Sequence, residues 1–338
     1  MPVTSRITRG LLVVLACVLV AACCPAVSRE PDGHRVSLVL RGAHNDTSTP
    51  FTLASVPALQ RHAYDGQDLS LDRVLARELA FTRYAVSYRG DGLRVTGVMN
   101  VPTRPGRHPL VVMAHGYASP NRYTSGSMLE REQSVLAGNG FVALQIDYRN
   151  YAGSSRESGR PVAEPVGYAA DLVNAVVAVK AARLPFVDTR RIALFGRSMG
   201  GGVVLDALAA RPGLVRAAVL YSPVSSLAGD NYRRWVRPRP ALRQRVERAY
   251  GSPDTRPAFW REASSRDYLD RVDVPVQIHH GTVDPMCPLS WSVATAAALR
   301  AEGKDVTLYE YPGEDHRFGP AWPRFMHRTL TFLHQRLG

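Results

Sequence analysis

The 338-residue sequence predicts an α/β fold with a mostly parallel central sheet and helices on both of its faces. Short apolar runs of strand length alternate with longer segments of helical pattern, as expected when crossover helices join parallel strands. The strands are expected at 110–114, 141–147, 192–195, 217–221, 276–280 and 306–311. The helices are expected at about 168–182, 199–211, 289–302 and 322–336.

The sheet is expected to begin with an antiparallel hairpin. Residues 85–88 and 93–99 alternate between apolar and polar, and the turn Gly90-Asp91-Gly92 separates them. We therefore place the main domain at 85–338. Within it, residues 225–270 break the alternation with a segment rich in Arg, Trp, Tyr and Pro, which predicts a small cap over the strand ends.

A glycine-rich turn directly follows the strand at 192–195. Gly196-Arg197-Ser198-Met199-Gly200 has the G-x-S-x-G spacing of the nucleophile elbow of α/β-hydrolases. A serine nucleophile must stand on a sharp turn within reach of a histidine, and the flanking glycines let strand and helix pass closely. Ser198 is therefore the candidate nucleophile. The alternative is a glycine-rich turn in which the serine has no role.

Candidate partners follow in the order Ser, Asp, His that this fold uses. Asp284 follows the strand at 276–280 and His316 follows the strand at 306–311. Both therefore lie at the carboxyl edge of the sheet, where sites form in open α/β folds. Asp270 and Asp273 precede the strand at 276–280 and would lie at its wrong end. Asp315 is interpreted as a loop-capping or solvated carboxylate, and His279 and His280 as structural histidines.

An oxyanion hole is expected beside the elbow. In this fold one donor is the backbone N–H after the nucleophile, here Met199, and the other comes from the loop after an early strand, here Tyr117. Gly116 would let the backbone approach the developing negative charge. His115 is interpreted as a packed, structural histidine.

Four segments resemble the catalytic domain of the prolyl oligopeptidase-like serine hydrolases, a group that includes peptidases and single-domain esterases similar to dienelactone hydrolases. The segments lie at 111–117, 147–154, 196–201 and 281–284. The resemblance covers about residues 85–338 and implies catalysis without a metal or organic cofactor. Only about 60 residues separate the expected leader from residue 85, and one propeller blade takes about 40–45. The β-propeller of the peptidases therefore does not fit, which favours an esterase.

Residues 1–22 are expected to be a signal peptide of the lipoprotein type. Arg6 and Arg9 precede an apolar stretch at 11–20 that is too short to span a bilayer. Val20-Ala21-Ala22-Cys23 then resembles a bacterial lipobox, so we expect Cys23 to carry lipid on the extracytoplasmic face of the cell membrane. Cleavage near residues 26–28, giving a secreted protein, is the alternative. Residues 23–84 would form a tether and extension.

The formal net charge is +13, and nearly all of the positive charge is arginine. Seven arginines between 233 and 248 form either a basic face for anionic lipids or envelope polymers, or a solvated helical surface. Nucleic acid is not an expected partner, and the cysteines lack metal-binding spacing. Four aromatic residues of the cap could shape a pocket or pack its core: Tyr232, Trp235, Trp260 and Tyr268.

The sequence therefore predicts a serine hydrolase that cleaves carboxylic esters of small-molecule or envelope origin through an acyl-enzyme on Ser198. Three alternatives stay open: a peptidase of the same fold, an acyltransferase, and a non-catalytic surface-binding lipoprotein. The acyl group, the leaving group and the oligomeric state are not specified by the sequence.

Overall fold

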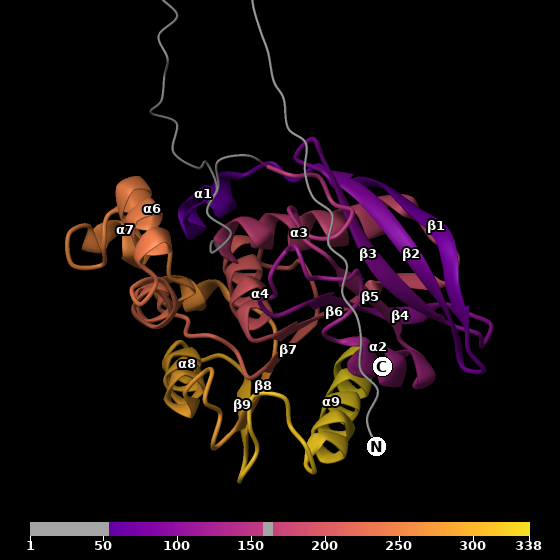
Figure 1. Ribbon diagram of the computed structural model, residues 1–338. Coiled ribbons are helices and arrows are strands. Elements are labelled where there is room, and N and C mark those ends of the chain that lie inside the picture. The colour runs from indigo at the N-terminus through magenta and orange to yellow at the C-terminus, as the bar shows by residue number, and fades with distance from the viewer. Residues whose placement is uncertain (1–53, 158–164) are drawn as a thin grey trace, which may run out of the picture. The chain divides into compact units, whose positions relative to one another are not determined.

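The computed structural model describes residues 54–157 and 165–338 (Figure 1). The expected signal peptide, Cys23 and most of the tether lie outside the described residues. In the described part of the chain, no helix is both long and apolar enough to cross a membrane.

The described residues contain one nine-stranded sheet in the order β1-β2-β3-β5-β4-β6-β7-β8-β9. Pairing is antiparallel from β1 through β3 to β5, and parallel from β5 to β9. This confirms the mostly parallel sheet and its opening hairpin. The strands are β1 (Gln67–Arg77), β2 (Phe81–Gly90), β3 (Leu93–Pro102), β4 (His108–Ala114), β5 (Val142–Ile146), β6 (Val187–Arg197), β7 (Ala217–Tyr221), β8 (Val276–Gly281) and β9 (Val306–Tyr311).

The sheet begins earlier than residue 85, where the sequence analysis placed the start of the main domain. The helix α1 (Val56–Arg61) and the strand β1 precede that point, and β1 pairs along the length of β2. No residue of β1 is fully buried. Since an edge strand has only one partner and a largely solvated surface, it lacks the continuous apolar run by which the inner strands are recognised.

Helices cover both faces of the sheet (Figure 1). In β4, Leu110 and Val112 pack into one apolar cluster with α3 and α4, whereas Val111 and Met113 pack into a second cluster with α9. Alternate side chains of a strand point to opposite faces, so these inner strands are buried on both sides. The flanking helices are α2 (Glu130–Gly138), α3 (Pro165–Ala182), α4 (Met199–Ala210), α8 (Leu289–Ala301) and α9 (Trp322–Leu337).

The segment between β7 and β8 folds as short helices with a small core of their own. Tyr232 and Tyr250 are 5% exposed and pack with Phe259 and Trp260. Of the two roles expected for the cap aromatics, Tyr232 and Trp260 therefore have the second: they pack the core of the cap. The helices of this cap insertion are α5 (Ala228–Asn231), the π-helix η1 (Tyr232–Val236), α6 (Pro240–Tyr250), α7 (Pro257–Glu262) and the 3₁₀ segment η2 (Ser265–Arg271).

The helix α4 contains a buried carboxyl group. Asp206 is 6% exposed and hydrogen-bonds with Ser265 of η2. Burial raises the pKa of Asp206 to about 8, and the bond with Ser265 opposes this only in part. The folded protein therefore holds Asp206 as a neutral acid at neutral pH.

We expect Asp206 to make stability fall as pH rises. In the unfolded chain its carboxyl ionises near pH 4, whereas the folded protein retains the proton until about pH 8, so the folded state loses about 1.4 kcal/mol per pH unit between these limits. Asp206→Asn should remove this loss. Urea unfolding at pH 5 and pH 8 should show the free energy of unfolding of the variant, relative to that of the wild type, rising by about 4 kcal/mol. Parallel pH curves for the two proteins would contradict this assignment.

Candidate active site

Parallel pairing gathers the candidate loops at one edge of the sheet. Ala114 at the end of β4 pairs with Gly196 of β6. On the other side of β6, the strands β7, β8 and β9 follow in spatial order. The loops after β6, β8 and β9 carry Ser198, Asp284 and His316, so the three predicted residues leave the sheet at the same edge.

Ser198 occupies the turn between β6 and α4. Its backbone has φ 57° and ψ −121°, a conformation that costs energy in a residue with a side chain. The N–H of Ser198 donates to Tyr221 O over 2.9 Å, and the N–H of Gly201 donates to Ser198 O over 2.9 Å. The neighbouring strand and the following helix therefore hold the turn from both sides.

The glycines around Ser198 have no room for a side chain. A Cβ at Gly200 would lie 1.9 Å from Ala114 O, and one at Gly196 would lie 2.2 Å from Gly200 O. A Cβ at Gly116 would lie 3.1 Å from the Cβ of Ser198. The elbow and the loop after β4 thus approach each other closely, as the sequence motif predicts.

Asp284 and His316 are in direct contact. Nδ1 of His316 donates to Oδ2 of Asp284 over 2.7 Å, and the Asp284 side chain is fully buried. An ionised carboxylate only accepts hydrogen bonds, so Nδ1 carries a proton, and in the neutral imidazole Nε2 then has a free lone pair. That is the tautomer a general base needs.

The remaining bonds of Asp284 keep it ionised. Its Oδ1 accepts from the backbone N–H groups of Met286 at 2.8 Å and Cys287 at 2.9 Å. Burial raises the pKa of Asp284, but hydrogen bonds from His280 and His316 oppose burial, and the net pKa lies well below the ordinary value. Asp284 is therefore a permanent anion beside the imidazole.

The interpretation of His280 as purely structural was incomplete. Its Nε2 lies 3.3 Å from Oδ2 of Asp284 and 2.8 Å from the carbonyl oxygen of Cys287. Since a carbonyl only accepts, Nε2 carries the proton, while the hydroxyl of Ser292 lies 2.6 Å from Nδ1. His280 therefore contacts the same oxygen of Asp284 that His316 does. Its place at the strand end, four residues before Asp284, was the signal available in the sequence.

Cys287 lies against the candidate nucleophile. Its buried thiol hydrogen-bonds with Ser198, and burial raises the pKa of the thiol to about 12. Cys287 is thus a neutral group lining the site. Within the described residues no hydrogen bond joins Ser198 to His316; contacts of this kind often form only when substrate is bound.

Tyrosine hydroxyls hold the predicted oxyanion loop. Tyr148 donates to His115 O over 3.2 Å, and Tyr151 donates to Ala118 O over 3.1 Å. His115 is fully buried and stacks on Tyr123 with ring centroids 4.4 Å apart, which confirms its packing role. These contacts fix the backbone on both sides of residue 117.

The two predicted oxyanion donors differ in exposure. The side chain of Tyr117 is 57% exposed, whereas Met199 is 5% exposed at the first position of α4. The first N–H groups of a helix have no partner within the helix, so the N–H of Met199 is free to donate toward the elbow.

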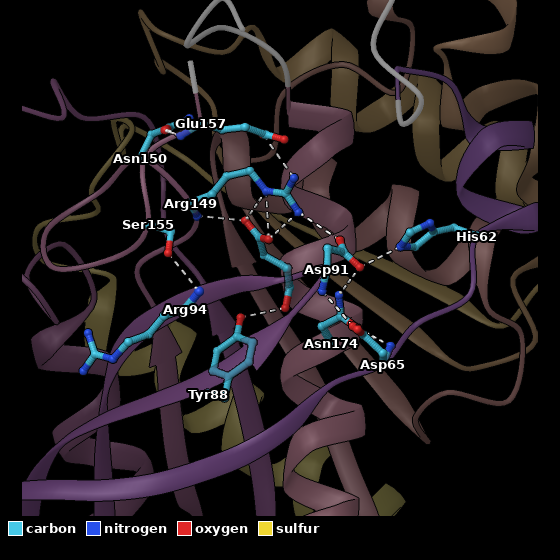
Figure 2. A network of polar contacts seen from close by, with 11 residues as sticks. His62, Asp65, Tyr88, Asp91, Arg94, Arg149, Asn150, Ser155, Glu157 and Asn174 are labelled. Atoms are coloured by element: carbon cyan, nitrogen blue, oxygen red, sulfur yellow. Dashed lines mark hydrogen bonds and ion pairs between the residues drawn. The ribbon is translucent and has the colours of Figure 1, made fainter. Parts of the chain in front are cut away.

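A buried ion network anchors the segment that carries Tyr148 and Tyr151 (Figure 2). Nη2 of Arg149 lies 2.7 Å from Oδ1 of Asp171 on α3, and the backbone N–H of Arg149 donates to the other oxygen of that carboxylate over 2.8 Å. Asp91 lies 3.1 Å from the guanidinium and joins the network to the turn between β2 and β3. The sequence offered no signal that Asp91 and Asp171 would be the partners of Arg149, because they come from separate elements.

The chain belongs to the prolyl oligopeptidase family of serine hydrolases, because the sequence model of that family matches residues 127–338. It is 25% identical over 263 residues to the uncharacterized peptidase YtmA of Bacillus subtilis. That alignment covers 73% of this chain and 91% of the relative.

Solved structures confirm the predicted α/β-hydrolase fold. Acetyl xylan esterase 1 from Thermoanaerobacterium sp. matches with a TM-score of 0.59 and 20% identity, covering 79% of this chain and 88% of the esterase. The Pyrococcus horikoshii acylaminoacyl peptidase matches with a TM-score of 0.62 and 20% identity, covering 77% of this chain and 42% of the peptidase. At this identity the likeness is one of fold.

Because the backbone segments at the elbow approach so closely, adding one methyl group at Gly200 is expected to destabilise the fold strongly. Gly200→Ala should lower the free energy of unfolding by more than about 3 kcal/mol, since the new Cβ would collide with Ala114 O. Gly138→Ala is the matched control, because a Cβ there meets nothing within 4 Å. Urea unfolding of the three proteins tests this. Equal tolerance of the two substitutions would contradict the described turn.

Proposed function

We propose that the protein is a carboxylesterase that forms an acyl-enzyme on Ser198. The observation that carries the proposal is the 2.7 Å bond between Nδ1 of His316 and the buried Asp284 carboxylate. That bond leaves Nε2 of His316 available as a base. His316 lies at the same edge of the sheet as the strained turn at Ser198. An imidazole oriented by a carboxylate is what a weak serine nucleophile requires.

In the proposed reaction, Oγ of Ser198 attacks the carbonyl carbon of the ester while Nε2 of His316 takes its proton. The backbone N–H groups of Met199 and Tyr117 receive the oxyanion, and each such donor is worth about 3 kcal/mol in the transition state. His316 then gives the proton to the departing alcohol oxygen. A water molecule, deprotonated by His316, attacks the acyl-enzyme and releases the acid, while Asp284 stabilises the imidazolium at both stages.

An ester substrate is supported by the likeness to acetyl xylan esterase 1, of which the chain covers 88%. Peptidase activity is the second candidate, supported by the relative YtmA, of which the chain covers 91%. Acyl transfer to an acceptor other than water would use the same residues. Attachment to the membrane through Cys23 stays a prediction, and so does export.

The proposal is tested by kcat/KM for an ester and an amide with the same acyl group. The ester should be cleaved much faster, because an alcohol or phenol is a better leaving group than an amine and depends less on protonation by His316. Ser198→Ala should abolish turnover, a loss of about 10⁶-fold, and Asp284→Asn should lose about 10⁴-fold, while the melting temperature changes little.

Asp315→Asn is the matched control for the Asp284 assignment. Asp315 adjoins His316 but accepts from the N–H of Arg317 at 2.8 Å, so this variant should keep activity within a few-fold. Equal losses in Asp284→Asn and Asp315→Asn would contradict the proposed roles. Comparable turnover of the amide would favour the peptidase instead.

A further inference from the structure

An arginine of the cap insertion reaches the loop that carries Asp284. Nε of Arg234, in the π-helix η1, donates to Met286 O over 2.8 Å, and its Nη2 donates to Pro285 O. These carbonyls belong to the two residues that follow Asp284. The guanidinium is therefore held in a fixed position next to the proposed site, although Arg234 itself is exposed.

The positive charge of Arg234 is not neutralised by the protein. In residues 54–157 and 165–338, Arg234 bonds to carbonyl oxygens and pairs with no carboxylate. Its neighbour Arg233, by contrast, lies 3.4 Å from Asp230. Carbonyl groups fix a guanidinium without cancelling its charge, and three of its five N–H groups remain for another acceptor.

A short segment links Arg234 to the proposed nucleophile, Ser198. The guanidinium binds Met286, and the next residue, Cys287, hydrogen-bonds with Ser198 through its side chain. Burial is the largest influence on the pKa of Cys287, and the charge of Arg234 acts on the same thiol in the opposite direction. One short segment therefore connects the guanidinium to the proposed nucleophile.

The surrounding cap adds positive potential. Residues 232–250 contain seven arginines and a single acidic residue, Glu247. The carboxylate of Glu247 is already bonded to the hydroxyl of Tyr232. Arg243, Arg245 and Arg248 are exposed on α6. A surface of one sign raises the local concentration of oppositely charged ligands.

We propose that Arg234 binds a carboxylate of the substrate, so that the preferred esters are anionic. The inference rests on the proposed function, because it assigns the substrate class of the same site. A planar guanidinium with free N–H groups matches a carboxylate in a way that a point charge does not. A fixed cation beside the nucleophile selects for that group during binding and positions the ester carbonyl at Ser198.

The test compares kcat/KM for anionic and neutral esters of matched shape. One pair carries the charge on the acyl side, mono-4-nitrophenyl succinate against 4-nitrophenyl methyl succinate. The other carries it on the leaving group, 4-acetoxybenzoate against its methyl ester. In at least one pair the wild type should prefer the anion about tenfold, and Arg234→Gln should abolish that preference. Arg261→Gln, an exposed arginine of α7, is the control and should keep the preference.

Two results would overturn the inference: no preference for the anion in either pair, or a preference that survives in Arg234→Gln even if both rates fall. The second result would mean that Arg234 only holds the loop that carries Asp284 in position. Calorimetry of monomethyl succinate with Ser198→Ala separates this failure from failure of the proposed function. If Ser198→Ala binds monomethyl succinate, Ser198→Ala/Arg234→Gln does not, and the wild type turns over no ester, only the proposed esterase activity is contradicted. If the wild type turns over neutral esters but does not prefer the anionic member of either pair, only the proposed role of Arg234 is contradicted.

Discussion

The turn at Ser198 joins a buried strand to a buried helix in a conformation that side chains avoid, and the candidate site is built around it. A φ of 57° persists because β7 accepts the Ser198 N–H and the first turn of α4 bonds back to its carbonyl. The strain is tolerated because Gly196 and Gly200 allow three stretches of backbone to meet without side chains between them. The same closeness brings Gly116, in the predicted oxyanion loop, against the serine.

Polar contacts beyond the proposed triad hold its members in position. Asp284 receives hydrogen bonds from two imidazoles and two backbone N–H groups, so it stays charged although its side chain is buried. The predicted oxyanion loop, residues 115–118, is held by two tyrosine hydroxyls, and the segment carrying those tyrosines is anchored through the Arg149–Asp171 pair (Figure 2). Such preorganisation lets donors meet a developing charge without first rearranging.

The sequence predicts the order of the inner strands and helices along the chain, because strands buried on both faces appear as continuous apolar runs. It also predicts the loop positions of Ser198, Asp284 and His316, because parallel strands end at one edge. The edge strand β1 was missed, since few of its residues need to be apolar. The contacts of His280 and Arg234 were missed for another reason: they are tertiary contacts, and Arg234 meets Met286 across 52 positions.

The most direct test of the account is the site of covalent labelling by a fluorophosphonate, located by mass spectrometry of peptides from the folded protein. A serine becomes reactive toward this reagent only when a base and an oxyanion hole activate it. The account predicts a single adduct on Ser198, absent in Ser198→Ala and strongly slowed in Asp284→Asn. An adduct on another residue, or no adduct in the folded wild-type protein, would contradict it.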